Sequence, residues 1–146
     1  MPVEGEYEPS PQKWVRDQVA EYEASGGARA NTLMDRGIPV VIVTTKGAKT
    51  GKVRKLGLMR VEHAGEYALV ASMGGAPQNP VWYHNLKAHP SITVEVGTET
   101  FPVEATEVLG SERQEIWAAA VAVNPGFGEY QRKTTRTIPV VLLTRA

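Results

Sequence analysis

The sequence predicts an α+β protein whose core is an antiparallel β-barrel. Three observations lead to this fold class: the 146 residues fit one domain, the strand-like runs come in hairpin pairs, and the helical patterns stand between these pairs. A doubly wound sheet would instead alternate single strands with helices. About six strands are expected, at 40–45, 54–63, 66–72, 92–96, 100–108 and 138–144.

The predicted strands are apolar or β-branched runs bounded by turn residues. Ala64-Gly65 joins the second strand tightly to the third, and Gly97-Thr98-Glu99 joins the fourth to the fifth. The two strands of each of these pairs are therefore expected to form an antiparallel hairpin.

The first of four predicted helices spans 11–25. Pro11 directly after Ser10 favours a helix start, and Gly26 favours the end. Trp14 lies off the apolar face of this helix. We therefore expect the helix to pack against the domain, with peripheral contact to a membrane surface as the alternative.

Three shorter helices are expected further along the chain. A proline opens the helical segment at 80–87, and a capping-box pattern from Ser111 to Gln114 precedes the helix at 116–123. The last helical segment, at 127–134, leads into the final strand.

Composition narrows the classes of protein to which the chain can belong. Residues 1–9 are acidic and contain proline, so they are expected to form a flexible segment, and 10–146 are expected to form a single domain. The chain has no cysteine, 16 basic and 16 acidic residues, and no apolar run of the roughly 18 residues that a membrane span needs. These features favour a cytoplasmic protein with no general attraction to nucleic acid. The three histidines, His63, His84 and His89, lack metal-ligand spacing, so no metal site is expected.

Several common catalytic motifs are missing from the chain. No G-x-G-x-x-G sequence opens a helix after a strand, and the glycine-containing segment 47–52 has the wrong spacing for a Walker loop. Ser72 is not part of a G-x-S-x-G elbow. Rossmann-type, P-loop and serine-hydrolase interpretations are therefore not supported.

Basic residues gather between two predicted strands. The segment 46–60 holds six of them and no acid, namely Lys46, Lys49, Lys52, Arg54, Lys55 and Arg60. Gly47 and Gly51 can adopt positive φ and so turn backbone N–H groups toward one point. The pattern predicts a site for phosphate or carboxylate, the alternative being a solvated hairpin whose lysines protect a sheet edge.

Aromatic residues beside glycines provide a second candidate for binding. The Gly74-Gly75 loop precedes a group that could wall a flat ring or plug the core: Trp82, Tyr83 and Asn85. A later group could form a second wall or the basic face of an amphipathic helix: Phe127, Tyr130, Arg132, Lys133 and Arg136. Together with the basic segment, these groups describe a pocket for a large, planar, anionic ligand.

Three stretches carry a resemblance to a known family. In their order and spacing, the segments 44–54 (TTKGAKTGKVR), 71–86 (ASMGGAPQNPVWYHNL) and 136–140 (RTIPV) are similar to the deazaflavin-dependent nitroreductase family of actinobacterial F420H2-dependent reductases. The similarity runs from Pro39 to the C-terminus. It implies an α+β fold with an antiparallel split β-barrel and flanking helices, related to the FMN-binding split barrels. It also implies binding of coenzyme F420, an 8-hydroxy-5-deazaflavin with a phosphodiester and a polyglutamate tail.

The resemblance implies a set of site residues, position by position. Those that would hold the phosphate and the acidic tail are Lys49, Thr50 and Arg54. Those along the two sides of the coenzyme would be Gly57, Leu58 and Met59, opposite Val70, Ala71, Ser72 and Met73. Those closing the deazaflavin end would be Val81, Trp82 and Asn85, with Tyr130 on the substrate side. The chain departs from relatives at Met73, where some have a lysine, and at Asn124 and Phe127, where a nitroimidazole-activating relative has tyrosines.

The implied activity is hydride transfer from the reduced deazaflavin to an electron-poor conjugated acceptor, such as an enone, an unsaturated lactone, a quinone or a nitroaromatic. Tyr130 or Ser72 would hydrogen-bond the oxyanion that develops on the acceptor, and Tyr130 or water would donate a proton. Two other functions stay open: an FMN-binding split-barrel oxidoreductase, and a nucleic-acid-binding module that uses the basic hairpin. The protein is expected to be a monomer or a homodimer.

Overall fold

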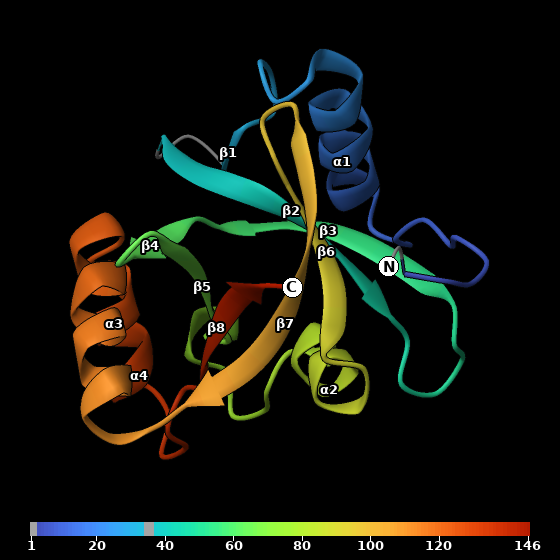
Figure 1. Cartoon of the computed structure of the whole chain (residues 1–146). Coiled ribbons are helices and arrows are strands. Elements are labelled where there is room, and N and C mark those ends of the chain that lie inside the picture. The colour runs from blue at the N-terminus through green and yellow to red at the C-terminus, as the bar shows by residue number, and fades with distance from the viewer. Residues whose placement is uncertain (1–2, 34–36) are drawn as a thin grey trace.

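The computed structural model describes residues 3–33 and 37–146, and its strands form an antiparallel sheet that curls into a half-barrel (Figure 1). The strands are β1 (Thr32–Leu33), β2 (Ile38–Lys46), β3 (Val53–Met59), β4 (Val61–His63), β5 (Glu66–Val70), β6 (Ser91–Val96), β7 (Glu99–Val108) and β8 (Val140–Arg145). The helices are α1 (Lys13–Ser25), α2 (Val81–Ala88), α3 (Gly110–Val123) and α4 (Gly126–Arg132), and a 3-10 turn, η2, spans Met73–Gly75. In the view of Figure 1, α3 and α4 lie together at the left, α1 at the upper right and α2 at the bottom. The predicted α+β class and antiparallel barrel-type sheet are confirmed, with eight strands among the described residues where about six were expected.

The order of the strands brings the two ends of the sheet together. Neighbouring strands run β1-β2-β6-β7-β8-β5-β4, and β3 pairs with β2 outside this path. A single residue, Arg60, separates β3 from β4, and its N–H donates to Pro39 O at 2.8 Å. The strand predicted at 54–63 is therefore two strands, because the chain changes its pairing partner from β2 to β5 at Arg60.

Strand β2 is buried on both of its faces. Val41 and Val43 belong to the core inside the half-barrel. Val40 and Ile42, on the other face, pack against Val19 of α1. Because successive residues of a strand point to opposite faces, this burial requires an apolar run without alternation. The uninterrupted apolar sequence of β2 is thus explained by its central position.

Helix α1 packs on the sheet through its apolar face and ends at a glycine cap. Gly26 has a left-handed conformation (φ 61°), and Gly27 N–H donates to Tyr22 O at 2.9 Å. Tyr22 is buried, and its Oη accepts a hydrogen bond from Gly97 N–H at 2.7 Å. The helix is thereby attached to the turn between β6 and β7.

Two predicted helix starts differ from the structure. Gln12 is the N-cap of α1, and Ser10 Oγ accepts from its N–H at 3.2 Å, so Ser10 forms a turn outside the helix. Helix α3 begins at Gly110 with Leu109 as its N-cap and makes no side-chain cap hydrogen bond. The capping box predicted at Ser111 is therefore wrong, because the helix has already started at that residue.

Part of the acidic N-terminal segment is hydrogen-bonded to β3. Val53 N–H donates to Glu6 O at 2.8 Å, and Glu8 N–H donates to Val53 O at 2.9 Å. Tyr7 forms an isolated parallel bridge with Val53. The segment predicted to be flexible thus satisfies backbone groups on the edge of β3 that faces away from β2.

A cluster of ionisable side chains links α1 to the sheet. Lys55 Nζ of β3 lies 2.7 Å from Glu23 Oε2 of α1. Burial, and then the hydrogen bond and negative charge of Glu23, raise the pKa of Glu95 in β6 to about 7. The pKa of Glu23 is lowered. Burial by itself would raise this pKa, but the hydrogen bonds with Glu95 and Lys55 together have the larger effect. Tyr7 also faces this cluster, since Lys55 Nζ lies 5.3 Å from its ring centroid. The two carboxyl groups therefore share a proton near neutral pH.

The shared proton makes the stability of the fold depend on pH. Because the pKa of Glu95 is raised in the folded protein, its favourable contribution is complete below the unfolded pKa and is lost as the pH rises through about 7. Glu95→Gln resembles the protonated form, so we expect it to be more stable than the wild type at about pH 8, by roughly 1 kcal/mol after allowance for solvent screening. The difference should shrink toward about pH 5, as measured by urea denaturation. Glu99→Gln, at an exposed carboxylate paired with Arg145, is the control; parallel pH profiles for the wild type and Glu95→Gln would contradict the assignment.

Candidate functional site

The basic loop between β2 and β3 is a tight turn in which each glycine has its own role. Gly47 N–H donates to Lys52 O at 2.8 Å, and Gly51 N–H donates to Gly47 O at 2.9 Å. Gly51 has the positive φ that the sequence predicts, at 71°. Gly47 does not; a Cβ at this residue would lie 2.7 Å from Thr50 Oγ1, so a larger residue would displace the Thr50 side chain. The predicted strand–loop–strand connection is confirmed.

A cavity of about 330 Å³ lies between this loop and α2, and we call it the loop cavity. Its lining residues are Gly47, Ala48, Lys49, Thr50, Arg54, Val81, His84 and Asn85. Asn85 is buried, and its Oδ1 accepts from Ala48 N–H at 3.0 Å, which ties the loop to the helix. The structure thus brings together the residues that the resemblance assigns to the phosphate and the tail, with two of those assigned to the deazaflavin end.

A second cavity, of about 290 Å³, lies over the sheet, and we call it the sheet cavity. Its lining residues are Gln12, Trp14, Val15, Leu33, Leu56, Gly57, Leu58, Met59, Val70, Ser72, Met73, Pro80, Trp82 and Phe127. Most of these side chains are apolar, so the cavity suits a flat, weakly polar ligand. Gln12 and Ser72 are the polar exceptions. Ser72 is buried, and within the described part of the chain its hydroxyl makes no hydrogen bond.

Two elements, β3 and α2, line both cavities. Arg54 lines the loop cavity, and further along the same strand Leu56, Gly57, Leu58 and Met59 line the sheet cavity. Val81 and Trp82, in the first turn of α2, line one cavity each. A cationic compartment therefore adjoins an apolar one along β3 and the first turn of α2.

Two predicted site residues lie outside both cavities. Ala71 is fully buried in the core. The ring of Tyr130 packs edge-on against Phe127, with centroids 6.1 Å apart, and Phe127 is the one of the two that lines the sheet cavity. A Cβ at Gly126 would lie 3.5 Å from Tyr130 Oη, so the hydroxyl lies near the start of α4.

The sequence gives little indication of the part that α1 plays in the sheet cavity. Gln12, Trp14, Val15 and Leu33 all line it, although the segment before Pro39 carries none of the motif residues. In the sequence, the one signal of this role is Trp14, which lies off the apolar face of the helix. In the structure, 53% of Trp14 is exposed. A large apolar side chain at such a position indicates a surface that contacts something else.

Glycine at position 57 lets α1 approach the sheet closely. Gln18 Nε2 donates to Ala30 O at 3.3 Å and to Thr32 O at 3.1 Å, which fixes its amide. A Cβ at Gly57 would lie 2.8 Å from Gln18 Oε1. The absence of a Cβ at Gly57 therefore leaves room for the Gln18 amide of α1 against β3.

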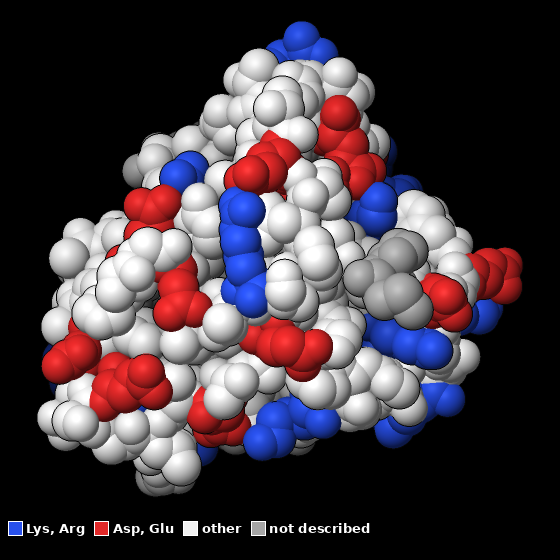
Figure 2. Space-filling view, in the orientation of Figure 1, with Lys and Arg blue, Asp and Glu red and all other residues white. Residues whose placement is uncertain are grey.

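The charges at the loop cavity are partly neutralised by the N-terminal segment. Glu8 Oε2 lies 2.5 Å from Arg54 Nη1, and Glu8 Oε1 lies 3.6 Å from Lys52 Nζ. Lys49 makes no ion pair with any residue that the structure describes. Elsewhere, the face shown in Figure 2 has Lys and Arg interspersed with Asp and Glu. Among the described residues, the basic segment thus keeps Lys49 as a cation without an ion-pair partner at the cavity.

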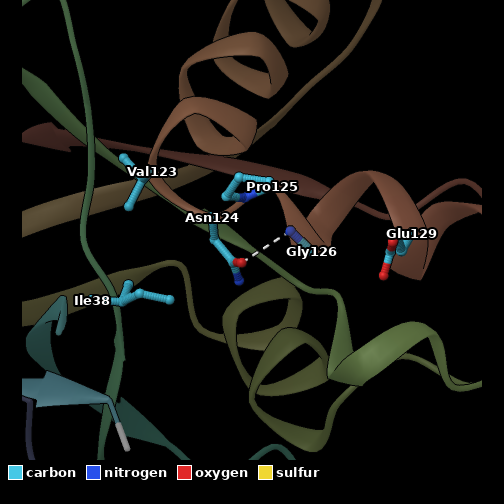
Figure 3. Close-up of a pocket in the computed structure, with 6 residues that line it drawn as sticks. All are labelled: Ile38, Val123, Asn124, Pro125, Gly126 and Glu129. Carbon is cyan, nitrogen blue, oxygen red and sulfur yellow. Dashed lines mark hydrogen bonds between the residues drawn. The ribbon is translucent and has the colours of Figure 1, made fainter. Parts of the chain in front are cut away.

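A separate hollow of about 410 Å³ lies where α3 turns into α4 (Figure 3). Ile38 lies across it from Val123, Asn124 and Pro125, and Asn124 Oδ1 accepts from Gly126 N–H at 3.0 Å. Asn124 Nδ2 donates to Met59 Sδ at 3.3 Å, so this buried side chain joins the hollow to a residue of the sheet cavity. Among the described residues of its lining, only Glu129 is ionisable. The described part of this lining therefore holds no basic residue, in contrast to that of the loop cavity.

Two further searches of residues 3–33 and 37–146 bear on the class of site. No group of three or more His, Asp or Glu side chains that could hold a metal ion occurs among these residues. None of the helices in this part of the chain is both long and apolar enough to cross a membrane.

Comparison with known proteins gives consistent results. A family model described as F420H(2)-dependent quinone reductase matches residues 14–145. An F420H(2)-dependent quinone reductase of Mycobacterium tuberculosis (strain H37Rv) is 39% identical over 110 residues, which cover 73% of this chain and 74% of the relative. A solved F420-H2 dependent reductase, FDR-A, is 49% identical, covers 72% of this chain and 93% of its own, and superposes with a TM-score of 0.68. A second solved structure, described as a domain-swapped dimer, is 45% identical, covers 92% of this chain and 99% of its own, and has a TM-score of 0.70.

The contact between Gly57 and Gln18 can be tested by a double-mutant cycle. Gly57→Ala should displace the Gln18 amide and cost about 1 kcal/mol of stability, because hydrogen bonds of that amide are lost. In a Gln18→Ala background the same change should cost much less, since the obstructing side chain is gone. Urea denaturation of the four proteins measures the coupling. Additive effects would show that the two residues do not meet.

Proposed function

Since the chain belongs to the F420H(2)-dependent quinone reductase family, we propose that it transfers a hydride from reduced coenzyme F420 to an electron-poor conjugated acceptor, with a quinone as the favoured class. The observation that carries the proposal is the pairing of a cationic compartment with an apolar one along β3. A coenzyme with a flat ring at one end and phosphate and carboxylate groups at the other requires such a pair.

The residues present fit this coenzyme. In the loop cavity, Lys49 and Arg54 offer positive charge and Thr50 offers a hydroxyl, which suit phosphate and carboxylate oxygens. In the sheet cavity, Trp82 and the backbone around Gly57 form walls that suit a planar ring. When bound in reduced form, F420 supplies the hydride.

The chain's own residues would bind, orient and exclude water. Lys49 and Arg54 would hold the anionic end, and Trp82 would restrict the tilt of the ring. Trp14 and Leu33, from the segment that packs over the cavity, would keep water from the reacting atoms. Because Ser72 has a hydroxyl free within the described residues and lies at the cavity wall, we assign to it the hydrogen bond to the acceptor's developing oxyanion.

Tyr130 remains a second candidate for the acceptor side. Its hydroxyl lies near Gly126, which lines the hollow of Figure 3, whereas its ring supports Phe127 at the sheet cavity. A direct proton transfer from Tyr130 would therefore require an acceptor that extends from the sheet cavity toward that hollow. Water is the alternative proton donor.

Support for the quinone comes from the family model and from the named relative of M. tuberculosis. Enones, unsaturated lactones and nitroaromatics belong to the same electronic class and stay in the assay panel. The FMN and nucleic-acid alternatives gain no support from these matches. We include a homodimer in the proposal because a relative with 45% identity is described as a domain-swapped dimer. We also propose that the protein is cytoplasmic. The exposed Trp14 would then contact the surface of a membrane that holds the quinone.

Ligand binding is the first test. Coenzyme F420 should bind more tightly than FMN or FAD in a fluorescence titration, and Lys49→Ala/Arg54→Ala should weaken its binding at least about tenfold, because charge-assisted hydrogen bonds are lost. Arg29→Ala/Lys87→Ala removes the same charge from exposed positions away from the cavities and serves as the control. A preference for FMN, or equal losses in the two variants, would contradict the proposal.

The role of Ser72 is tested by steady-state kinetics. Ser72→Ala should lower kcat/KM for a soluble quinone roughly tenfold or more while the Kd of the coenzyme changes little, because the hydrogen bond forms to the acceptor. Ser111→Ala, on the exposed surface of α3, should change neither quantity. Tyr130→Phe with full kcat/KM would remove the tyrosine from the mechanism, and Ser72→Ala with full kcat/KM would remove the serine.

A further inference from the structure

The loop from Ala71 to Pro80, which joins β5 to α2, presents several residues to the sheet cavity, and we call it the cavity loop. Ser72, Met73 and Pro80 all line the cavity. Its backbone is unusual, because Met73 has a positive φ of 46° and Gly75 one of 83°. A non-glycine residue in the left-handed region costs roughly 1–2 kcal/mol, so its conformation persists only where surrounding contacts hold it.

Arg136, from the segment between α4 and β8, supplies those contacts. Its Nη2 donates to Ser72 O at 2.8 Å, and its Nε donates to Ala76 O at 2.9 Å. Its Nη1 donates to Asn79 Oδ1 at 2.8 Å and to Ala71 O at 3.2 Å. The guanidinium of Arg136 therefore donates hydrogen bonds to four residues spread along the cavity loop, namely Ala71, Ser72, Ala76 and Asn79.

The acceptors around Arg136 are neutral. Among the described residues no carboxylate pairs with it, and burial lowers the pKa of Arg136. A charged group that loses hydration without gaining an opposite charge is costly, so its hydrogen bonds must repay the loss.

The backbone that carries Arg136 is itself fixed. Gln131 Nε2 donates to Arg136 O at 2.7 Å, and Gln131 Oε1 accepts from Ile138 N–H at 2.9 Å. On the other side, a Cβ at Gly75 would lie 2.6 Å from Tyr130 O, so the cavity loop also lies close against α4. The guanidinium is thus held between a braced segment and the loop.

We propose that Arg136 is a positioning residue, whose guanidinium holds the cavity loop in the conformation that presents Ser72 and Met73 to the bound ligands. The effect on activity rests on the proposed function, whereas the effect on the loop does not. Lysine cannot replace arginine here, because an ammonium on a flexible stem lacks the planar fork that reaches acceptors on both sides. The side chain acts through the loop, without contact to the ligands.

Arg113 provides a matched control. Its Nη2 donates to Ile138 O at 2.7 Å, and its guanidinium lies 5.0 Å from the Trp117 ring centroid, so it too is a partly buried arginine bound to a backbone carbonyl. Neither Ile138 nor Trp117 lines the loop cavity or the sheet cavity. Ile138 belongs to the segment that Gln131 braces, so Arg113→Lys removes an arginine contact to that segment while all four hydrogen bonds from Arg136 to the cavity loop stay in place. We therefore expect Arg113→Lys to affect stability and to leave the cavity loop unchanged.

The experiment compares amide hydrogen exchange in the wild type, Arg136→Lys and Arg113→Lys. In the cavity loop, Gly75 N–H donates to Ser72 O at 2.9 Å and Ala76 N–H donates to Met73 O at 3.1 Å, so these two amides report on the loop. Arg136→Lys should raise their exchange rates at least about tenfold relative to core amides. Arg113→Lys should leave the two amides as in the wild type. Unchanged exchange of both amides in Arg136→Lys would overturn the proposal.

Kinetics and binding then test the consequence for the site. Arg136→Lys should lower kcat for a soluble quinone roughly tenfold, whereas Arg113→Lys should retain kcat. Should wild-type protein fail to bind F420, the proposed function fails, yet the exchange measurement still decides the role of Arg136. If Arg136→Lys does not fold, Asn79→Ala removes one acceptor and should raise the same two exchange rates about threefold; no change in that variant would overturn the proposal.

Discussion

The central constraint on this molecule is the burial of β2 on both faces. Its alternate residues serve two cores at once, one inside the half-barrel and one beneath α1. Because a strand with this position has no solvent-facing side, it can carry charged residues only where it leaves the sheet. The basic loop begins at that exit, so the position of the cationic compartment follows from the burial of the strand before it.

The same constraint explains why a helix far from the family motifs contributes to the site. Covering the outer face of β2 requires α1, and once α1 lies there its first turn extends over β3 to the sheet cavity. Close packing at Gly57 and the ionisable cluster at Lys55 both lie along that contact. The apolar compartment is therefore walled partly by a tertiary contact, and the stability of the helix and the shape of the cavity are coupled.

The sequence was informative where a signal is local. The hairpins at Ala64-Gly65 and Gly97-Thr98 have turn residues that specify them, and the glycines of the basic loop sit between two clear strands. The division of one predicted strand at Arg60 could not be read, because a change of pairing partner leaves the local pattern unchanged. Likewise, motif similarity placed Ala71 and Tyr130 at the site, but whether a side chain reaches a cavity depends on packing from elements distant in sequence.

The ion pair between Glu8 and Arg54 means that the N-terminal segment influences the binding affinity measured at the loop cavity. A carboxylate from the protein already stands where an acidic ligand would need to bring its own, so binding there becomes an exchange of one anion for another. In a protein that lacks residues 1–8, or that has a charged extension at its N-terminus, Arg54 would have different charges around it before any ligand binds. Apparent affinities for anionic ligands would then reflect where the polypeptide was cut as well as which ligand was added.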